Sequence, residues 1–314
     1  MKKILLFIMA LGLAQVSCSD DDGASLSVST NTVELDPAGT GVLVEVQTNE
    51  SIWRVVSEAD WVTIERHEDG NVTLGAQSNS KKQERSARVA ICAGDRYERI
   101  TVTQAPSLRS VGDAYPDAAA PIGMLYKISD GGYHGFVVSL DMMQCAWGTY
   151  GEAHEGATMN AFDGRANTRK IIEAHKDAAD FETAYPAYHW VYEKNGRDLD
   201  GGWYIPAFWE LVEMRNTLTG NSFTAPAPGT APSMMQGNLQ ITHNMAVRDD
   251  FNTIITSLGG TPVEYGNVAY WSSTEANGYN AYRVAFASGF YSGSATMTSG
   301  GKTNVHYVRA VYEF

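Results

Sequence analysis

Residues 26–104 contain short runs in which apolar and polar side chains largely alternate. The runs Trp53–Ser57, Trp61–Glu65 and Ser86–Cys92 have the two-residue period of a half-buried β-strand. Turn-forming clusters such as Asp36-Pro37-Ala38-Gly39 separate them. About seven runs in about eighty residues predict an all-β sandwich. The predicted strands are residues 26–29, 42–48, 53–57, 61–65, 71–77, 86–92 and 99–104.

The pattern changes after residue 105. Residues 106–120 mix Pro, Ser, Ala and Asp without an apolar period, which indicates a linker. Apolar runs at 122–128 and 135–140 flank Asp130-Gly131-Gly132, a hairpin signal. Helical patterns follow, and strands return from Tyr270, so residues 121–314 are predicted to form an α+β domain. The predicted helices are residues 167–177, 182–194, 207–217 and 248–258.

The N-terminus combines a cationic start with a short apolar run. Met1-Lys2-Lys3 precedes the apolar residues 4–14, and Val16-Ser17-Cys18 follows. This segment resembles a bacterial lipoprotein signal, which implies a signal peptide over 1–17 and a lipid on Cys18. The acidic tether 18–24 resembles the surface-export signal of Bacteroidetes lipoproteins, although a simple solvated tether has the same composition. We therefore expect an outer-membrane lipoprotein that faces the exterior.

Charge and cysteine content exclude several classes. The chain has 314 residues, with 23 Lys and Arg against 36 Asp and Glu, a net charge of −13. No nucleic-acid partner is expected for so acidic a chain, and no apolar stretch reaches the roughly 20 residues of a membrane span. Membrane contact is thus expected through the lipid anchor alone. Cys92 and Cys145 fall in different predicted domains, so each is expected to be a free thiol.

Particular residues within 25–105 carry a family resemblance. Trp53, Trp61, Asn79, Arg85–Val89 and Ile100–Gln104 together resemble the BACON domain, an immunoglobulin-like module. That family was named for proposed carbohydrate binding, so the two tryptophans could stack on sugars. We favour packing for both, because a tryptophan buries a large area in a small sandwich.

Three strings in the second domain carry another resemblance. GWYIPAFWEL at 202–211, AYWSSTE at 269–275 and YVRAV at 307–311 resemble bacterial C-type-lectin-like domains related to the formylglycine-generating-enzyme superfamily. Oxidase members of that superfamily use two neighbouring cysteines, and this domain has only Cys145. Ser272 and Ser273 follow Trp271 where calcium-dependent lectins have Trp-Asn-Asp, so a calcium–sugar site is not expected.

Other candidate chemistry is sparse. Glu210 and Glu213 lie three apart on a predicted helix, a spacing more typical of capping or solvated residues than of a catalytic pair. Asp198 and Asp200 stand beside glycine and are expected to form a turn rather than a cation site. No histidine pair has zinc-motif spacing, and His154 and His189 are expected to be core or surface residues. We therefore expect no enzyme activity, no metal and no cofactor.

The C-terminal segment has an abrupt change in composition. Of the 32 residues 276–307, 24 are Ala, Gly, Ser, Thr, Asn or Tyr, and none is Asp or Glu. Binding loops converge on this composition, because Tyr gives large contacts and Ser, Gly and Asn give adaptable hydrogen bonds. Val284 and Phe286 are expected to point inward, and Arg283, Ala285 and Ala287 outward. Ordinary surface loops remain the alternative interpretation.

This interleaving of fixed and polar positions resembles the variable proteins of diversity-generating retroelements. The resemblance implies ligand contacts at Tyr279, Arg283, Ala285, Ala287, Ser288, Phe290, Ser292, Ser294, Thr303, His306 and Tyr307. We expect Tyr279, Arg283, Phe290 and Tyr307 to converge on one exposed face. Trp203, Trp271, Val284 and Phe286 are expected in the core.

The leading hypothesis is a lipid-anchored surface receptor or adhesin that binds a protein or glycan ligand. The alternatives are a carbohydrate-active accessory protein or enzyme that uses Trp53 and Trp61, and a structural surface or pilus-associated subunit.

Overall fold

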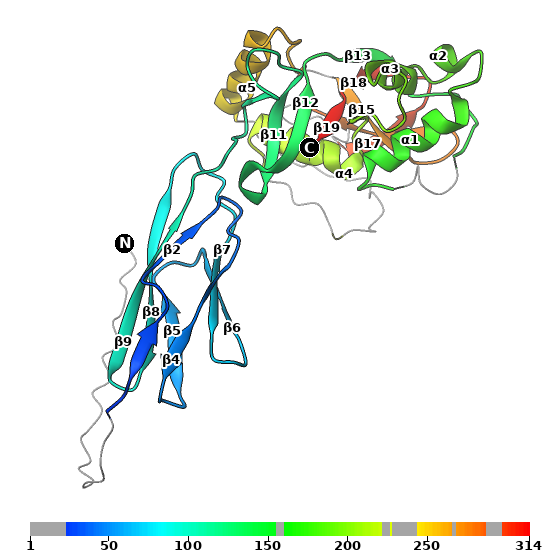
Figure 1. Cartoon of the computed structure of the whole chain (residues 1–314). Helices are drawn as coiled ribbons and strands as arrows, with labels where there is room; N and C mark the ends of the chain where they lie inside the picture. The colour runs from blue at the N-terminus through cyan, green and yellow to red at the C-terminus, as the bar shows by residue number, and fades with distance from the viewer. Residues whose placement is uncertain (1–22, 155–159, 222–226, 228–243, 266–267, 287–296) are drawn as a thin grey trace. The chain divides into compact units, whose positions relative to one another are not determined.

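The computed structural model describes residues 23–154, 160–221, 227, 244–265, 268–286 and 297–314 (Figure 1). The chain divides into two compact units. Of the described residues, the first unit contains 23–33, 41–74 and 86–102, and the second contains the remainder. The protein is therefore a β-rich chain of more than one domain, with an all-β part followed by an α+β part.

The all-β part consists of three small sheets. Their strand orders are β2-β9-β8-β5, β3-β7-β6 and β1-β4. Alternate residues of β8 point inward, so that Ala87, Val89 and Ile91 are buried while their neighbours are more exposed. The strands are β1 (Leu26–Val28), β2 (Thr32–Leu35), β3 (Val42–Val44), β4 (Val46–Thr48), β5 (Trp53–Ser57), β6 (Val62–Arg66), β7 (Val72–Ala76), β8 (Arg85–Ala93) and β9 (Arg96–Gln104).

Two details of this part differ from the sequence-based expectation. The predicted strand 42–48 is divided at the exposed Glu45 into β3 and β4, which belong to different sheets. The Glu45 backbone N–H bonds to the Ser29 hydroxyl at 3.0 Å, so the chain leaves one ladder there. Strand β2 was not predicted, although its Val33 and Leu35 are buried in alternation with exposed residues.

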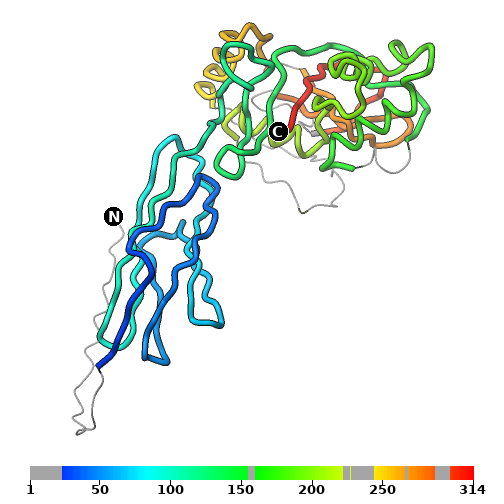
Figure 2. The backbone as a smooth tube through the Cα atoms, in the orientation of Figure 1, coloured from blue at the N-terminus to red at the C-terminus, as the bar shows by residue number. Residues whose placement is uncertain are grey.

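The α+β part contains two five-stranded sheets, β10-β11-β12-β19-β14 and β13-β18-β15-β16-β17. The C-terminal strand β19 lies between β12 and β14, and the red end of the trace in Figure 2 shows it running into this unit. The strands are β10 (Ala114–Tyr115), β11 (Gly123–Ser129), β12 (His134–Ser139), β13 (Met143–Ala146), β14 (Trp203–Tyr204), β15 (Ala269–Glu275), β16 (Asn280–Ala285), β17 (Met297–Gly301), β18 (Val305–Val308) and β19 (Val311–Glu313). The predicted hairpin is confirmed, because β11 and β12 pair through η1 (Asp130–Gly132).

Five α-helices are described in this unit: α1 (Gly164–His175), α2 (Phe181–Ala184), α3 (Pro186–Lys194), α4 (Phe208–Thr219) and α5 (Met245–Ser257). Asp163 caps α1 by accepting the Ala166 N–H at 2.8 Å. The predicted single helix 182–194 is wrong in one respect. Pro186 lacks a backbone N–H and starts a new helix, so α2 and α3 are separate. No described helix is both long and apolar enough to cross a bilayer.

Helices cover both faces of the sheet that contains β15 and β16. On one face Trp271, Cys145 and Val308 share a core with Ile171 of α1 and Val191 of α3. On the other face Tyr270, Val284 and Phe286 share a core with α4 and α5 side chains. The predicted core residues are confirmed: Trp203 is 9% exposed, and Trp271, Val284 and Phe286 are fully buried. This packing fixes the strand ends that carry the candidate site.

Candidate functional site

Three segments that are distant in sequence meet in the second unit. The Gly151 N–H donates to the Gly278 carbonyl at 2.9 Å, and the Trp147 N–H donates to the Lys302 carbonyl at 2.8 Å. The Lys302 N–H in turn donates to the Tyr279 carbonyl at 3.0 Å. We call residues 147–154, 276–280 and 301–304 the rim. These main-chain bonds set the three segments side by side.

The rim exposes two tyrosines that contact each other. Tyr150 is 62% and Tyr279 is 52% exposed, and their ring centroids lie 4.8 Å apart at 52° between planes. The Asn277 side chain accepts the N–H groups of Tyr279 and Asn280, which fixes the turn that carries Tyr279. Thr303 and Asn304 are exposed on the neighbouring turn. The rim thus offers aromatic and amide groups to solvent from a hydrogen-bonded backbone.

A buried ion pair joins Lys302 of the rim to Glu275, the last residue of β15. The Lys302 ammonium pairs with the Glu275 carboxylate, and the two side chains are 0% and 1% exposed. The same ammonium donates to the Glu152 carbonyl and lies 4.7 Å from the centre of the Trp147 ring. One side chain therefore ties the 147–154 segment to β15, which stabilises the loop from inside the protein.

Two histidines extend this polar cluster. His154 bonds to Glu275 through both its backbone N–H, at 2.8 Å, and its Nδ1, at 3.3 Å. Its Nε2 faces the Nε2 of His175 at 3.0 Å. Glu152 lies beside them and accepts the Tyr185 hydroxyl at 2.6 Å. Burial lowers the pKa of His175, which favours the neutral imidazole. One ligand atom from each of Glu152, His154 and His175 lies within 4.8 Å of the other two.

The structure describes six of the eleven predicted ligand contacts. Tyr279 and Thr303 are exposed on the rim, whereas Arg283, Ala285, His306 and Tyr307 are only partly exposed. The other predictions lie outside the described residues: Ala287, Ser288, Phe290, Ser292 and Ser294, together with the lipidation site Cys18.

The expectation that Arg283 and Tyr307 share one exposed face is wrong. Arg283 is opposite Trp271 in the ladder, whereas Tyr307 is opposite Tyr270, and neighbouring residues of a strand point to opposite faces. The Tyr307 ring lies 5.6 Å from the Tyr270 ring, against the core covered by α4. Helices cover both faces of this sheet, so a side chain that points away from one core meets the other.

Arg283 and His306 form a partly buried pair on the Trp271 face. An Arg283 Nη1 lies 2.6 Å from the His306 Nε2, and the His306 ring lies 4.7 Å from the Trp271 ring. Burial, with the Arg283 charge, lowers the pKa of His306 to about 4. His306 is therefore neutral at physiological pH and accepts from the guanidinium, which fits a packing role.

The candidate carboxylates have structural roles. Glu210 accepts the Ala207 N–H at 2.7 Å at the start of α4, which confirms the capping interpretation. Glu213 pairs with Lys127 at 2.9 Å. Asp198 accepts the Asp200 N–H at 2.9 Å, as expected for a turn.

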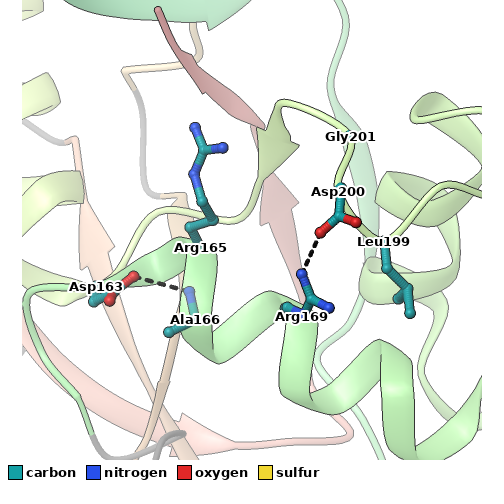
Figure 3. A pocket seen from close by; sticks show the side chains of 7 residues that line it. All are labelled: Asp163, Arg165, Ala166, Arg169, Leu199, Asp200 and Gly201. Carbon is teal, nitrogen blue, oxygen red and sulfur yellow. Dashed lines mark hydrogen bonds and ion pairs between the residues drawn. The ribbon is translucent and has the colours of Figure 1, made fainter.

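A pocket of about 230 Å³ lies beside α1 and is lined by Asp163, Arg165, Ala166, Arg169, Leu199, Asp200 and Gly201 (Figure 3). Its charged groups mostly satisfy one another. Arg169 pairs with Asp200 and with Glu173, and these hydrogen bonds raise the pKa of the guanidinium. Asp163 is occupied by capping α1. This pocket therefore holds a surface ion-pair network, and we assign it no ligand.

Residues 51–105 match the BACON family. The family is described as "Putative binding domain, N-terminal". No curated protein matches the chain. The match confirms the BACON resemblance over these residues, which belong to the all-β part.

Several solved structures are similar to the chain. A Bacteroides ovatus GH5 xyloglucanase in complex with a XXXG heptasaccharide is 26% identical over 29% of this chain, with a TM-score of 0.24. The chain covers only 20% of that enzyme. A Bacteroides ovatus fimbrial protein is 16% identical over 93% of this chain and 71% of its own length, with a TM-score of 0.45. A Bacteroides thetaiotaomicron protein solved by NMR is 16% identical over 30% of this chain and 98% of its own, with a TM-score of 0.24.

The two tryptophans of the BACON segment are both partly buried. The Arg66 guanidinium lies 3.9 Å from the centre of the Trp53 ring and donates to the Trp53 carbonyl at 3.2 Å. One face of Trp53 is therefore already covered by a cation, and this contact favours packing over sugar stacking.

Sequence reasoning missed Tyr150, Glu152 and the histidine pair. His154 and His175 are 21 residues apart, and Glu275 lies 121 residues from His154. No short motif joins residues at such separations. Trp271 and Lys302 were predicted as parts of a fixed frame, but neither pointed to the loop at 147–154.

Proposed function

We propose that the protein is a lipid-anchored cell-surface binding protein and that the rim of its second unit contacts the ligand. The observation that carries the proposal is the exposed Tyr150–Tyr279 pair. The two rings are in contact, and main-chain hydrogen bonds hold the segments that carry them. An exposed tyrosine that is already ordered loses little conformational entropy on binding, and it offers both apolar area and a hydroxyl.

The composition of the rim supports the same proposal. Asn277, Gly278 and Tyr279 on one turn, with Thr303 and Asn304 on the next, are the residue types that adapt their hydrogen bonds to different partners. The proposal includes a C-type-lectin-like fold for residues 121–314, an immunoglobulin-like fold for the BACON segment, and sequence variation in the segment 276–307. A near-repeat in the downstream DNA, differing at adenines, would support that variation.

The proposed role is binding without turnover. The ligand is a protein or a glycan, and Cys18 carries the lipid that holds the protein in the outer membrane with its ligand-binding unit facing outward. An alternative, a structural surface or pilus subunit, would need no exposed binding pair at the rim.

The test is binding of the purified chain to two printed arrays, one of host and bacterial polysaccharides and one of extracellular proteins. Tyr150→Ala and Tyr279→Ala should each weaken binding to any ligand found by about tenfold or more, the loss typical of an interface hot spot. Both variants should keep the native melting temperature, because the side chains are more than half exposed.

Tyr133→Ala is the matched control. Tyr133 is 49% exposed in the same unit but lies outside the rim, at the β11–β12 turn. Its removal should leave binding unchanged. Equal loss from Tyr133→Ala, or full binding by the two rim variants, would refute the rim as the contact surface. Absence of any ligand on both arrays would favour the structural-subunit alternative.

A further inference from the structure

Glu152 and His154 of the rim converge with His175 of α1. His154 and Glu152 belong to the loop after β13, and His175 is the last residue of α1. The two Nε2 atoms lie 3.0 Å apart, and the Glu152 Oε1 lies 3.8 Å from the His175 Nε2. The side chains of His154, His175 and Glu152 are 8%, 17% and 46% exposed, so the cluster is sheltered and reaches solvent through Glu152.

Neighbouring groups orient each of these side chains. Glu275, held by Lys302, faces the His154 Nδ1, so the proton of His154 is favoured on Nδ1 and its Nε2 lone pair points at His175. The Tyr185 hydroxyl donates to the Glu152 Oε2, which leaves Oε1 toward the histidines. The Tyr185 ring also stacks on His175, with centroids 4.1 Å apart. A carboxylate behind a histidine is the usual outer shell of a metal site.

We propose that Glu152, His154 and His175 bind one zinc ion. Two imidazole nitrogens and a carboxylate oxygen are a donor set that zinc prefers, with metal–ligand bonds of about 2.0–2.2 Å. Tetrahedral bonds of that length separate two nitrogens by about 3.4 Å. The observed 3.0 Å therefore needs to open by only a few tenths of an ångström, and Glu152, whose side chain is half exposed, has room to approach.

The proposed site has three protein ligands and therefore an open fourth position. In the metal-free protein the two Nε2 atoms share one hydrogen bond, with the proton on His175. Zinc would bind between the two Nε2 atoms in place of this proton. His175 would lose the proton from Nε2 to water and take one up at Nδ1, so that both rings stay neutral. The ion would join the 147–154 loop to the end of α1. Its ligand Glu152 is two residues from Tyr150 in the sequence. This inference does not depend on the rim's being the ligand-contact surface.

The test uses the full chain after treatment with a chelator. Competition with a zinc-binding dye should show one tight site per chain, and the X-ray absorption edge of the bound zinc should show two imidazole ligands. Zinc should also raise the melting temperature, because an ion that binds only the folded state stabilises it. His175→Gln should weaken zinc binding by about 100-fold or more.

Glu152→Gln separates the loss of a zinc ligand from a failure to fold. The glutamine keeps an acceptor for the Tyr185 hydroxyl but removes the charged ligand, so we expect normal folding with at least about tenfold weaker zinc binding. His189→Ala is the matched control: His189 lies on α3 and pairs with Glu193 at 3.5 Å, and its loss should change nothing. The proposal would be overturned if the native chain did not bind zinc, or if both site variants bound it as tightly as the native chain. Loss of zinc binding in His189→Ala would overturn it as well.

Discussion

One partly buried and one fully buried glutamate of the second unit, Glu210 and Glu275, show how the surroundings decide the charge state of a single residue. Burial raises the pKa of Glu210 to about 7, although two backbone N–H groups, from Ala207 and Gly164, donate to it. Burial acts in the same direction on Glu275, but hydrogen bonds from His154 and Lys302 outweigh it, so the pKa of Glu275 is lowered. Glu275 is thus a fixed anion next to the rim, and Glu210 titrates near neutrality.

The raised pKa of Glu210 predicts a pH-dependent stability. The folded state holds the proton up to about pH 7, whereas the unfolded chain releases it near 4.5, so ionisation costs stability as the pH rises between these values. Between pH 5 and 7.5 the free energy of unfolding should fall by about 2 kcal/mol more in the native chain than in Glu210→Gln. Urea unfolding at both pH values checks this. The control Glu213→Gln, one turn along α4, should show the same pH dependence of the free energy of unfolding as the native chain. If Glu210→Gln also showed the native pH dependence, the prediction would be wrong.

The Lys302–Glu275 pair predicts a large loss of stability when one partner is removed. Lys302→Met leaves the Glu275 carboxylate buried without its cation, and such changes cost about 3–5 kcal/mol. Lys127→Met removes the cation of the half-exposed pair with Glu213, which should cost no more than about 1 kcal/mol. Urea denaturation of the two variants measures the difference. If Lys302→Met and Lys127→Met lowered the free energy of unfolding by similar amounts, the prediction for the buried pair would be wrong.

At the level of elements, the two ends of β16 have different surroundings. The residue after the strand is buried in the core, whereas the turn before the strand is exposed. Phe286 is fully buried with its ring centroid 4.6 Å from that of Tyr270, whereas Tyr279 precedes β16 on the rim. The same short stretch of chain therefore carries a core residue and a candidate ligand contact, seven positions apart.

Truncation of Phe286 should destabilise the second unit. Phe286→Ala removes a buried ring and leaves a cavity, at a cost of about 3–5 kcal/mol. Tyr279→Ala should change the free energy of unfolding by less than about 0.5 kcal/mol, because its side chain is half exposed. Thermal unfolding followed by circular dichroism distinguishes them. A stable Phe286→Ala variant would show that the frame is not required.

At the level of the whole molecule, the expected membrane attachment rests on one residue. The described part of the chain contains no helix able to cross a bilayer, and Cys18 lies outside it. Lipidation of this cysteine would provide the several acyl chains that stable anchoring requires.

Cys18→Ser should therefore move the protein from the membrane fraction to the soluble fraction of the cells. Cys92→Ser is the control, since Cys92 lies in β8 and should have no part in anchoring. Cell fractionation followed by immunoblotting gives the result. Tight membrane association of Cys18→Ser would exclude the lipid anchor, and protease digestion of intact cells tests whether the native protein faces outward.

The order of residues along the chain was enough to predict the all-β and α+β parts, the β11–β12 hairpin, and the buried frame of Trp203, Trp271, Val284 and Phe286. These features follow from local periodicity, turn residues and side-chain size, which act over a few positions along the chain. It also placed Tyr279 correctly on an exposed turn.

The contacts between distant residues became visible in the folded chain alone. The alternation of β16 could not reveal that helices cover both faces of its sheet, so Arg283 and Tyr307 were wrongly expected to share an exposed face. Nor could it bring Tyr150 to Tyr279, or His154 to His175 and Glu275, because these contacts close loops of 21 residues or more. Such contacts depend on the packing of whole elements, which no short stretch of sequence encodes.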